Sequence, residues 1–145
     1  MELSTYFRIN AANTGHSVIT TIHANSCEDT YYRMVTLCKQ EQPGMDDATL
    51  QNLATKAFPI VAFAKRLEDN SRRIMEITEC ETLQDGRKKM RTLYRFNITD
   101  NIIVEGKPKI IGHYEKVENL SEGLQKRLRE NGLPLKMQEQ LLAKR

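Results

Sequence analysis

The stretch N-T-G-H-S-V-I-T-T-I-H-A-N-S at residues 13–26 combines a turn, a short β-branched run and a helix start. Asn13 and Gly15 predict the turn, because asparagine and glycine tolerate a positive φ. The valine and isoleucines that follow, set among threonines, predict a short buried strand. Asn25 or Ser26 then predicts the N-terminal cap of a helix. The stretch therefore predicts a strand that leads directly into a helix.

Polar side chains lie along and beside this predicted strand. His16 precedes its first residue and His23 follows its last, with threonine hydroxyls and the Asn25 amide nearby. Such polar side chains, carried by an apolar strand, suit a ligand group that is negatively charged and that is altered during a reaction. A single histidine beside a strand is more often a structural residue than a catalytic one. Here the pattern G-H-x(4)-T-x-H-A-N fixes several residue types at once, which favours a functional role.

This pattern resembles the histidine box of the type II/type IV secretion ATPases, the motors of pilus assembly, type II secretion and conjugation. It is most similar to the branch that serves Flp/Tad-type pili and related conjugative systems. Residues 65–79, K-R-L-E-D-N-S-R-R-I-M-E-I-T-E, resemble the strand–turn–strand of that family, and residues 93–96, L-Y-R-F, resemble its next strand. The resemblance covers most of the chain and is weakest after Asp100.

The resemblance implies an α/β fold, namely the C-terminal half of a RecA-like P-loop ATPase domain with antiparallel β-hairpins and C-terminal helices. Residues 1–145 would form a single partial domain, with the histidine box within residues 1–100 and a strand and helices within 101–145. In the family a histidine lies near the γ-phosphate of the nucleotide, so His23 and His16 are the candidate catalytic residues. The candidate nucleotide-binding residues are Gly15, Thr21, Asn25, Arg72 and Arg73.

The sequence contains no G-x(4)-G-K-[ST] motif, whose backbone N–H groups and lysine hold nucleotide phosphates. No strand that ends in a carboxylate precedes the histidine box either, as a Walker B strand would. We therefore expect the C-terminal part of a hexameric ATPase that is inactive alone. ATP and Mg²⁺ would belong to the full-length parent, and neither should bind tightly to this chain by itself.

Two other functions are consistent with particular residues, and a third, zinc binding, is not supported by the spacing of its candidate ligands. A non-catalytic protein-interaction module could use an exposed strand edge to pair with another chain. Nucleic-acid binding could use the basic run of the second hairpin, although such a run is more often a solvated edge that prevents aggregation. The residues of that run are Arg87, Lys88, Lys89, Arg91 and Arg95. A zinc site from Cys27, Cys38 and His23 fits no common ligand spacing.

Composition limits the class of protein further. The 145 residues are 39% hydrophobic and 28% charged, with a net charge of +3, which is the profile of one ordinary globular domain. A net charge this small argues against nucleic-acid binding through the overall charge of the protein. Three widely spaced cysteines predict free thiols in a reducing compartment. No run is long enough to span a membrane. We expect a cytoplasmic protein that self-associates and reaches the membrane through secretion or pilus platform proteins.

Periodicity predicts the remaining elements. A short helix is expected within residues 1–12, and a second follows Ser26, with a core-facing stripe of Tyr31, Met34, Val35 and Cys38. Asp46 should open a third helix that ends before Pro59. The apolar run 60–64 predicts a strand covered on both faces. Further strands are expected at 72–80, after the Asp85-Gly86 hairpin turn and at 109–114, followed by helices before Asn131-Gly132 and after Pro134.

Overall fold

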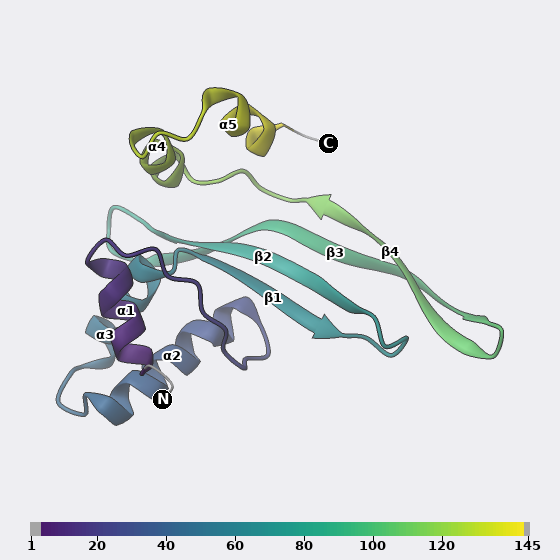
Figure 1. The fold of residues 1–145 in the computed structure, drawn as a ribbon, viewed down its shortest axis with the longest axis horizontal. Helices are drawn as coiled ribbons and strands as arrows, with labels where there is room; N and C mark the ends of the chain where they lie inside the picture. The colour runs from purple at the N-terminus through teal and green to yellow at the C-terminus, as the bar shows by residue number, and fades with distance from the viewer. Residues whose placement is uncertain (1–3, 144–145) are drawn as a thin grey trace. The chain divides into compact units, whose positions relative to one another are not determined.

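The computed structural model describes residues 4–143 and confirms a mixed α/β protein (Figure 1). Its elements are α1 (Thr5–Asn13), α2 (Cys27–Glu41), α3 (Asp47–Ala57), β1 (Ile60–Arg66), β2 (Arg72–Thr82), β3 (Lys88–Val104), β4 (Lys107–Lys116), α4 (Glu122–Glu130) and α5 (Leu135–Leu142). The chain forms two compact units, Met1–Val61 and Ala62–Arg145, which divide inside β1. The boundary expected near residue 100 falls inside β3.

Side-chain caps begin two helices of the first unit, as the sequence predicts. The Ser26 hydroxyl accepts a hydrogen bond from the Asp29 N–H at 3.0 Å, and the Asp29 carboxylate accepts one from the Asn25 N–H at 2.8 Å. Asp46 caps α3 by accepting from the Thr49 N–H. Hydrogen bonds from the Thr49 hydroxyl and N–H hold the pKa of Asp46 below its ordinary value of 3.8. Both caps satisfy N–H groups that have no partner within their helix.

Helical spacing in the sequence places Leu3, Tyr6, Phe7 and Asn10 on one face of the first helix, α1, but the structure buries a different residue. The Ser4 hydroxyl caps it by accepting from the Phe7 N–H at 3.1 Å. Ile9 is its buried residue, whereas Phe7 is exposed. Leu3, which belongs to the same predicted stripe, lies outside the described residues. The helix is confirmed, but its contact face is rotated toward Ile9.

The core of the first unit lies among α1, α2 and α3. Its buried side chains are Ile9, Cys27, Tyr31, Met34, Cys38, Leu50 and Ala54. The Tyr31 hydroxyl donates to the Phe58 carbonyl at 2.6 Å, so this buried polar group is satisfied. The Asn13 amide donates to the Leu53 carbonyl at 3.0 Å and joins α1 to α3. The stripe predicted for α2 is therefore confirmed as part of a helical core.

The three cysteines are free, as expected, and all three are buried. Burial, followed by the charge of Glu41, raises the pKa of Cys38 from 9.0 to about 11. The reactive thiolate of Cys38 is thus about 100-fold less populated near neutral pH. We expect Cys38 to be the slowest cysteine to react with a maleimide in the native protein, and all three to react after denaturation. Peptide mapping by mass spectrometry would show this, and rapid native labelling of Cys38 would contradict the packing of α2.

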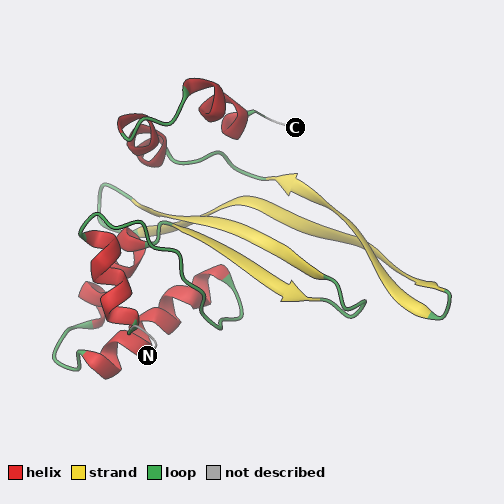
Figure 2. Ribbon diagram, in the orientation of Figure 1, coloured by secondary structure: helices red, strands yellow, loops and turns green. Residues whose placement is uncertain are grey.

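The four strands form an antiparallel sheet in the order β1-β2-β3-β4 (Figure 2). Consecutive strands are joined by tight turns, so each strand pairs with its neighbour in sequence. The predicted turn at Asp85-Gly86 is confirmed: Gly86 has φ 84° and the Leu83 N–H donates to the Arg87 carbonyl at 2.9 Å. The last hairpin turns at Glu105 and Gly106, both with positive φ.

Two details of the sheet differ from the predictions. Ile77 lies opposite Tyr94 but Thr78 lies opposite Thr92, so Leu93 is an extra residue in β3. The sequence predicts a regular alternation here, with Thr92, Tyr94, Phe96 and Ile98 on one face, and this β-bulge interrupts it. β1 lies at the edge of the sheet. Only Val61 and Phe63 of this strand are half-buried, and Ile60 is 40% exposed. The expectation that β1 is covered on both faces is wrong, because every second residue from Ile60 to Ala64 is exposed.

A buried carboxylate joins the sheet to the last helices. Glu79 of β2 is 2% exposed and accepts hydrogen bonds from both the N–H and the hydroxyl of Ser121. Ser121 also caps α4 by accepting from the Leu124 N–H. Asn131 and Gly132, which has φ 84°, end α4, and Pro134 precedes α5, as predicted. None of the helices in the described part of the chain is long and apolar enough to cross a membrane.

Candidate functional site

The histidine box lies in an extended segment that connects α1 to α2. The strand predicted from Val18, Ile19 and Ile22 is not formed, since residues 16–24 pair with no strand among those the structure describes (Figure 2). The reason is physical: a β-strand is stabilised by a hydrogen-bonded neighbour, and β-propensity alone cannot replace one. The predicted helix start after the box is correct.

The segment nevertheless keeps the alternation of a strand. Val18, Thr20, Ile22 and Ala24 are half-buried, whereas the residues between them are exposed. Ile19 is 100% exposed, which is unusual for an isoleucine. The segment therefore has an inward face against the helices and an outward face in solvent.

His16 follows the turn at the start of this segment. Gly15 has φ 94°, a conformation that side chains disfavour, so glycine suits this position. The Thr14 hydroxyl lies 3.5 Å from His16 Nδ1, and the His16 N–H donates to the Ala11 carbonyl. The imidazole is exposed and lies beside the Thr14 hydroxyl of this short turn.

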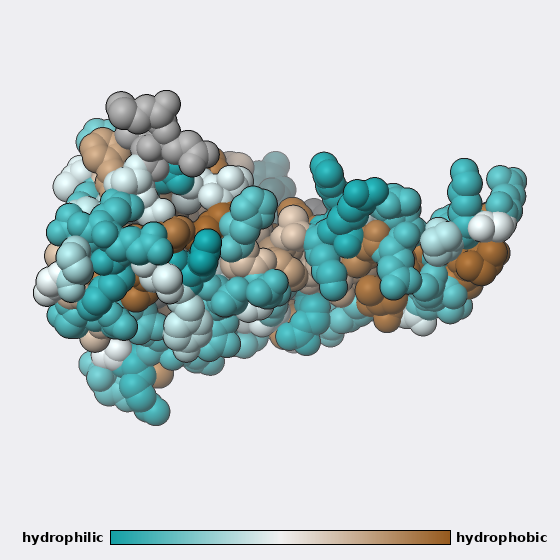
Figure 3. Space-filling model, turned by 90° about the horizontal axis from the view of Figure 1, so that it is seen from below, coloured by the Kyte–Doolittle hydropathy of each residue, from teal (hydrophilic) through white to brown (hydrophobic). Residues whose placement is uncertain are grey.

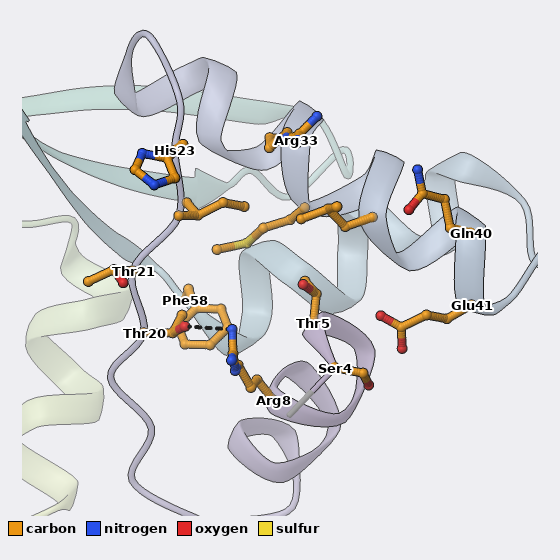
Figure 4. Close-up of a pocket in the computed structure, with 13 residues that line it drawn as sticks. Ser4, Thr5, Arg8, Thr20, Thr21, His23, Arg33, Gln40, Glu41 and Phe58 are labelled. Carbon is orange, nitrogen blue, oxygen red and sulfur yellow. Dashed lines mark hydrogen bonds between the residues drawn. The ribbon is translucent and has the colours of Figure 1, made fainter. Parts of the chain in front are cut away.

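His23 lines a groove of about 480 Å³ in the first unit (Figure 4). The groove lies among the segment at residues 20–23, the start of α1, the second half of α2 and the end of α3. Its apolar lining consists of Ile22, Met34, Leu37 and Phe58. Its polar lining consists of Ser4, Thr5, Arg8, Thr20, Thr21, His23, Arg33, Gln40 and Glu41.

The charges of the groove are mainly positive. Arg8 donates to the Thr20 hydroxyl at 3.3 Å, which ties α1 to the box segment. Arg33 and His23 lie apart on the rim in Figure 4, and Glu41 is the one acidic residue among the described residues of the lining. Two guanidinium groups and an imidazole favour an anion over a cation. The groove can thus attract a negatively charged group to the side on which His23 lies.

Thr21 and Asn25, two of the candidate nucleotide-binding residues, both lie in or beside the exposed box segment. Thr21 is exposed and lines the groove. Asn25 is exposed, and its N–H belongs to the cap of α2 through Asp29. The backbone of Asn25 is thus fixed by the start of α2.

Arg72 and Arg73 belong to the second unit, at the start of β2. The Arg73 guanidinium lies 4.8 Å from the centre of the Phe96 ring, and its Nε donates to the Ser71 hydroxyl at 3.3 Å. A cation over an aromatic face is a stabilising contact, so Arg73 has a structural role in this sheet. Arg72 is exposed.

The basic run proposed for nucleic acid is compensated by acids. Arg91 binds Glu81 and Glu118 with N···O distances of 2.6 Å each. Three other cations of the run have acidic partners, namely Arg87 with Asp85, Lys89 with Glu118 and Arg95 with Glu76, whereas Lys88 donates a hydrogen bond to the neutral hydroxyl of Thr82. Four of the five cations therefore lie beside a carboxylate, which weakens the attraction of the run for phosphates.

Sequence reasoning missed the two arginines of the groove. Arg8 and Arg33 line it, yet each looks like an ordinary surface residue in the sequence. A helical wheel offers a weak signal, since Arg8 precedes buried Ile9 and Arg33 precedes buried Met34. A residue next to a buried stripe lies at its border, where a polar group can reach both core and solvent.

A helical unit with an exposed histidine segment and an antiparallel sheet define a mixed α/β protein. A family model described as Type II/IV secretion system protein matches residues 4–142. The chain therefore belongs to this family, as the histidine box and residues 65–79 indicate. No curated protein matches the chain.

Proposed function

We propose that this chain is the C-terminal part of the RecA-like ATPase domain of a secretion, pilus-assembly or conjugation motor. The family match over residues 4–142 is the observation that carries this proposal. The exposed histidine box supports it, because a box that served only packing would be buried. The chain contributes this box to an ATP site whose phosphate-binding loop belongs to another part of the motor.

His23 acts on the negative charge of the γ-phosphate, and His16 assists from the turn. Phosphoryl transfer depends on positioned charges that stabilise the transition state more than on covalent chemistry by the protein. The positive rim of Arg8 and Arg33 suits the anionic phosphates. Residues 13–26 contain no carboxylate, so we assign no Mg²⁺ ligand to the box. Bound Mg²⁺ would neutralise phosphate charge, and other residues of the motor would hold it.

The same proposal covers the oligomeric state and the cellular location of the motor. The full-length parent forms a hexamer, and the complex works on the cytoplasmic side of a membrane through platform proteins. A role as a non-catalytic interaction module is the second candidate. Exposed aliphatic side chains such as Ile103 and Leu135 favour it, and hydrophobic residues reach the surface at several points in Figure 3.

The chain by itself should not hydrolyse ATP at a measurable rate, because the lysine and carboxylate that stabilise most of the charge are absent. Phosphate release with Mg²⁺ and ATP measures this. A chimera in which residues 4–142 replace the matching segment of an active family ATPase should regain hydrolysis. A folded but inactive chimera would contradict the proposal. So would metal-dependent hydrolysis by the chain alone that His23→Ala abolishes.

A further inference from the structure

The turn between β1 and β2 (Figure 1) places two arginines directly opposite each other. The Leu67 N–H donates to the Ser71 carbonyl at 2.8 Å, and the Asn70 N–H donates to the Leu67 carbonyl at 2.9 Å. In an antiparallel pair, the residue before Leu67 and the residue after Ser71 then face each other across the two strands. These residues are Arg66, the last of β1, and Arg72, the first of β2.

The turn between β2 and β3 supports this register, because it has the same two hydrogen bonds. The Leu83 N–H donates to the Arg87 carbonyl, and the Gly86 N–H donates to the Leu83 carbonyl, both at 2.9 Å. There the flanking residues Thr82 and Lys88 lie opposite each other, and the Lys88 ammonium donates to the Thr82 hydroxyl at 2.7 Å. The second turn thus has a compatible pair at the position where the first has two like charges.

No ion pair in the described chain neutralises the two opposed guanidiniums, which belong to exposed residues. Asp69, within the turn, accepts hydrogen bonds from the Ser71 hydroxyl at 2.6 Å and from the Ile110 N–H at 3.0 Å. Glu68, beside it in sequence, is exposed. Like charges that lie directly opposite each other destabilise a sheet. An anion bound between the two arginines would therefore stabilise this turn.

We propose that Arg66 and Arg72 form a clamp for a terminal phosphate group, that is, for a phosphate monoester or free phosphate. Directly opposite residues have Cβ atoms about 4.5–5.5 Å apart, so both guanidiniums can reach one small anion. A terminal phosphate carries about two negative charges at pH 7 and three acceptor oxygens, which match two guanidiniums. A phosphodiester or a carboxylate carries a single charge and leaves one guanidinium unmatched.

The turn also holds one arm of the clamp in place. Arg66 Nη2 donates to Asn70 Oδ1 at 2.6 Å, and Asn70 has φ 62°, a conformation that asparagine tolerates. This bond uses one N–H of the guanidinium and leaves others for a ligand. The next pair along the strands, Lys65 and Arg73, lies on the other face, where Arg73 is held over Phe96.

Only the register of the turn brings Arg66 to Arg72. The sequence marks Arg72 as a candidate for nucleotide binding but gives no sign of Arg66 as its partner. The clamp belongs to the second unit, whereas the groove beside His23 belongs to the first. The inference therefore concerns a separate site and does not rest on the proposed ATPase function.

The experiment uses the full 145-residue chain and two ligands with the same nucleoside. AMP has a terminal phosphate, whereas the phosphate of cyclic AMP is a diester. Titrations followed by NMR of the arginine side-chain N–H signals should show AMP binding about tenfold tighter than cyclic AMP. Inorganic phosphate is the third arm. An affinity equal to that of AMP means that the phosphate group alone is recognised, and tighter binding of AMP means that the site takes a nucleotide. Both results support the clamp.

Arg66→Gln and Arg72→Gln should each weaken AMP binding by about tenfold without lowering the melting temperature, because each removes one of two opposed like charges. Arg87→Gln is the matched control, since Arg87 is an exposed arginine at the equivalent turn and is already paired with Asp85 at 2.6 Å. Arg33→Gln removes a cation of the groove. Both control variants should bind AMP as the parent chain does.

Equal affinity for AMP and cyclic AMP would overturn the proposal. So would unchanged AMP binding in Arg66→Gln and Arg72→Gln, or an equal loss in Arg87→Gln, which would indicate attraction by charge alone. A loss confined to Arg33→Gln would place the anion in the groove and would also reject the clamp. If the chimeric ATPase fails but AMP binding depends on Arg66 and Arg72, the clamp stands without the ATPase function.

Discussion

Replacing His23 by alanine in the active chimera is expected to lower kcat by about 10²–10³-fold while ATP affinity stays nearly unchanged. Most of the affinity comes from the phosphate-binding loop of the motor, which this variant does not alter. A histidine that acts on the γ-phosphate matters chiefly as charge shifts toward the transition state. An interaction made only in the transition state changes kcat rather than ground-state binding. His16→Ala should act in the same direction with a smaller effect.

His113→Ala is the matched control, because His113 is an exposed histidine of β4, outside the box. Its kcat should equal that of the parent chimera. Melting temperature, ATP affinity and kcat are measured on the same preparations of all variants. A purely structural role of His23 would lower the melting temperature and leave kcat per folded molecule unchanged. That result would reject the catalytic assignment.

Gly112→Ala is expected to destabilise the sheet by roughly 3 kcal/mol, the upper part of the range for overpacked sites. A Cβ atom at Gly112 would lie 2.6 Å from Cζ of Phe96 and would also collide with the Asn97 carbonyl oxygen. The Phe96 ring cannot move aside easily, because it is buried beneath the guanidinium of Arg73 and contacts Tyr114, with ring centres 5.0 Å apart. The Asn97 carbonyl belongs to the backbone of β3, which pairs with β4. The strands β3 and β4 would therefore have to separate locally.

Urea unfolding of the variant measures this loss. Gly123→Ala is the matched control, because a Cβ there meets only the Ser121 hydroxyl at 3.8 Å. Gly123 lies inside α4, where alanine is the better helix former, so this variant should be neutral or slightly stabilising. Equal stability of Gly112→Ala and the parent would show that β4 does not pack against Phe96 as described.

Much of the local structure follows from short-range chemistry. The caps at Ser26 and Asp46 and the turn at Asp85-Gly86 depend on residues within a few positions of one another. The sequence therefore contains all the partners that these features need. The family follows in the same way, because the histidine box is a local pattern. The buried stripe of α2 was also predictable, since one amphipathic helix reveals its own face.

Tertiary structure alone decided the features that depend on distant partners. The strand expected at Val18–Ile22 is absent because no neighbouring strand of the described chain pairs with it, although its sequence has the right propensity. The bulge at Leu93 depends on its register with β2, and the role of Arg73 depends on Phe96, which belongs to a different strand. By itself the sequence determined the helix starts at Ser26 and Asp46, the hairpin turn at Asp85-Gly86 and the family. Only the fold decided which edges are paired, because a backbone hydrogen bond needs a second strand in space.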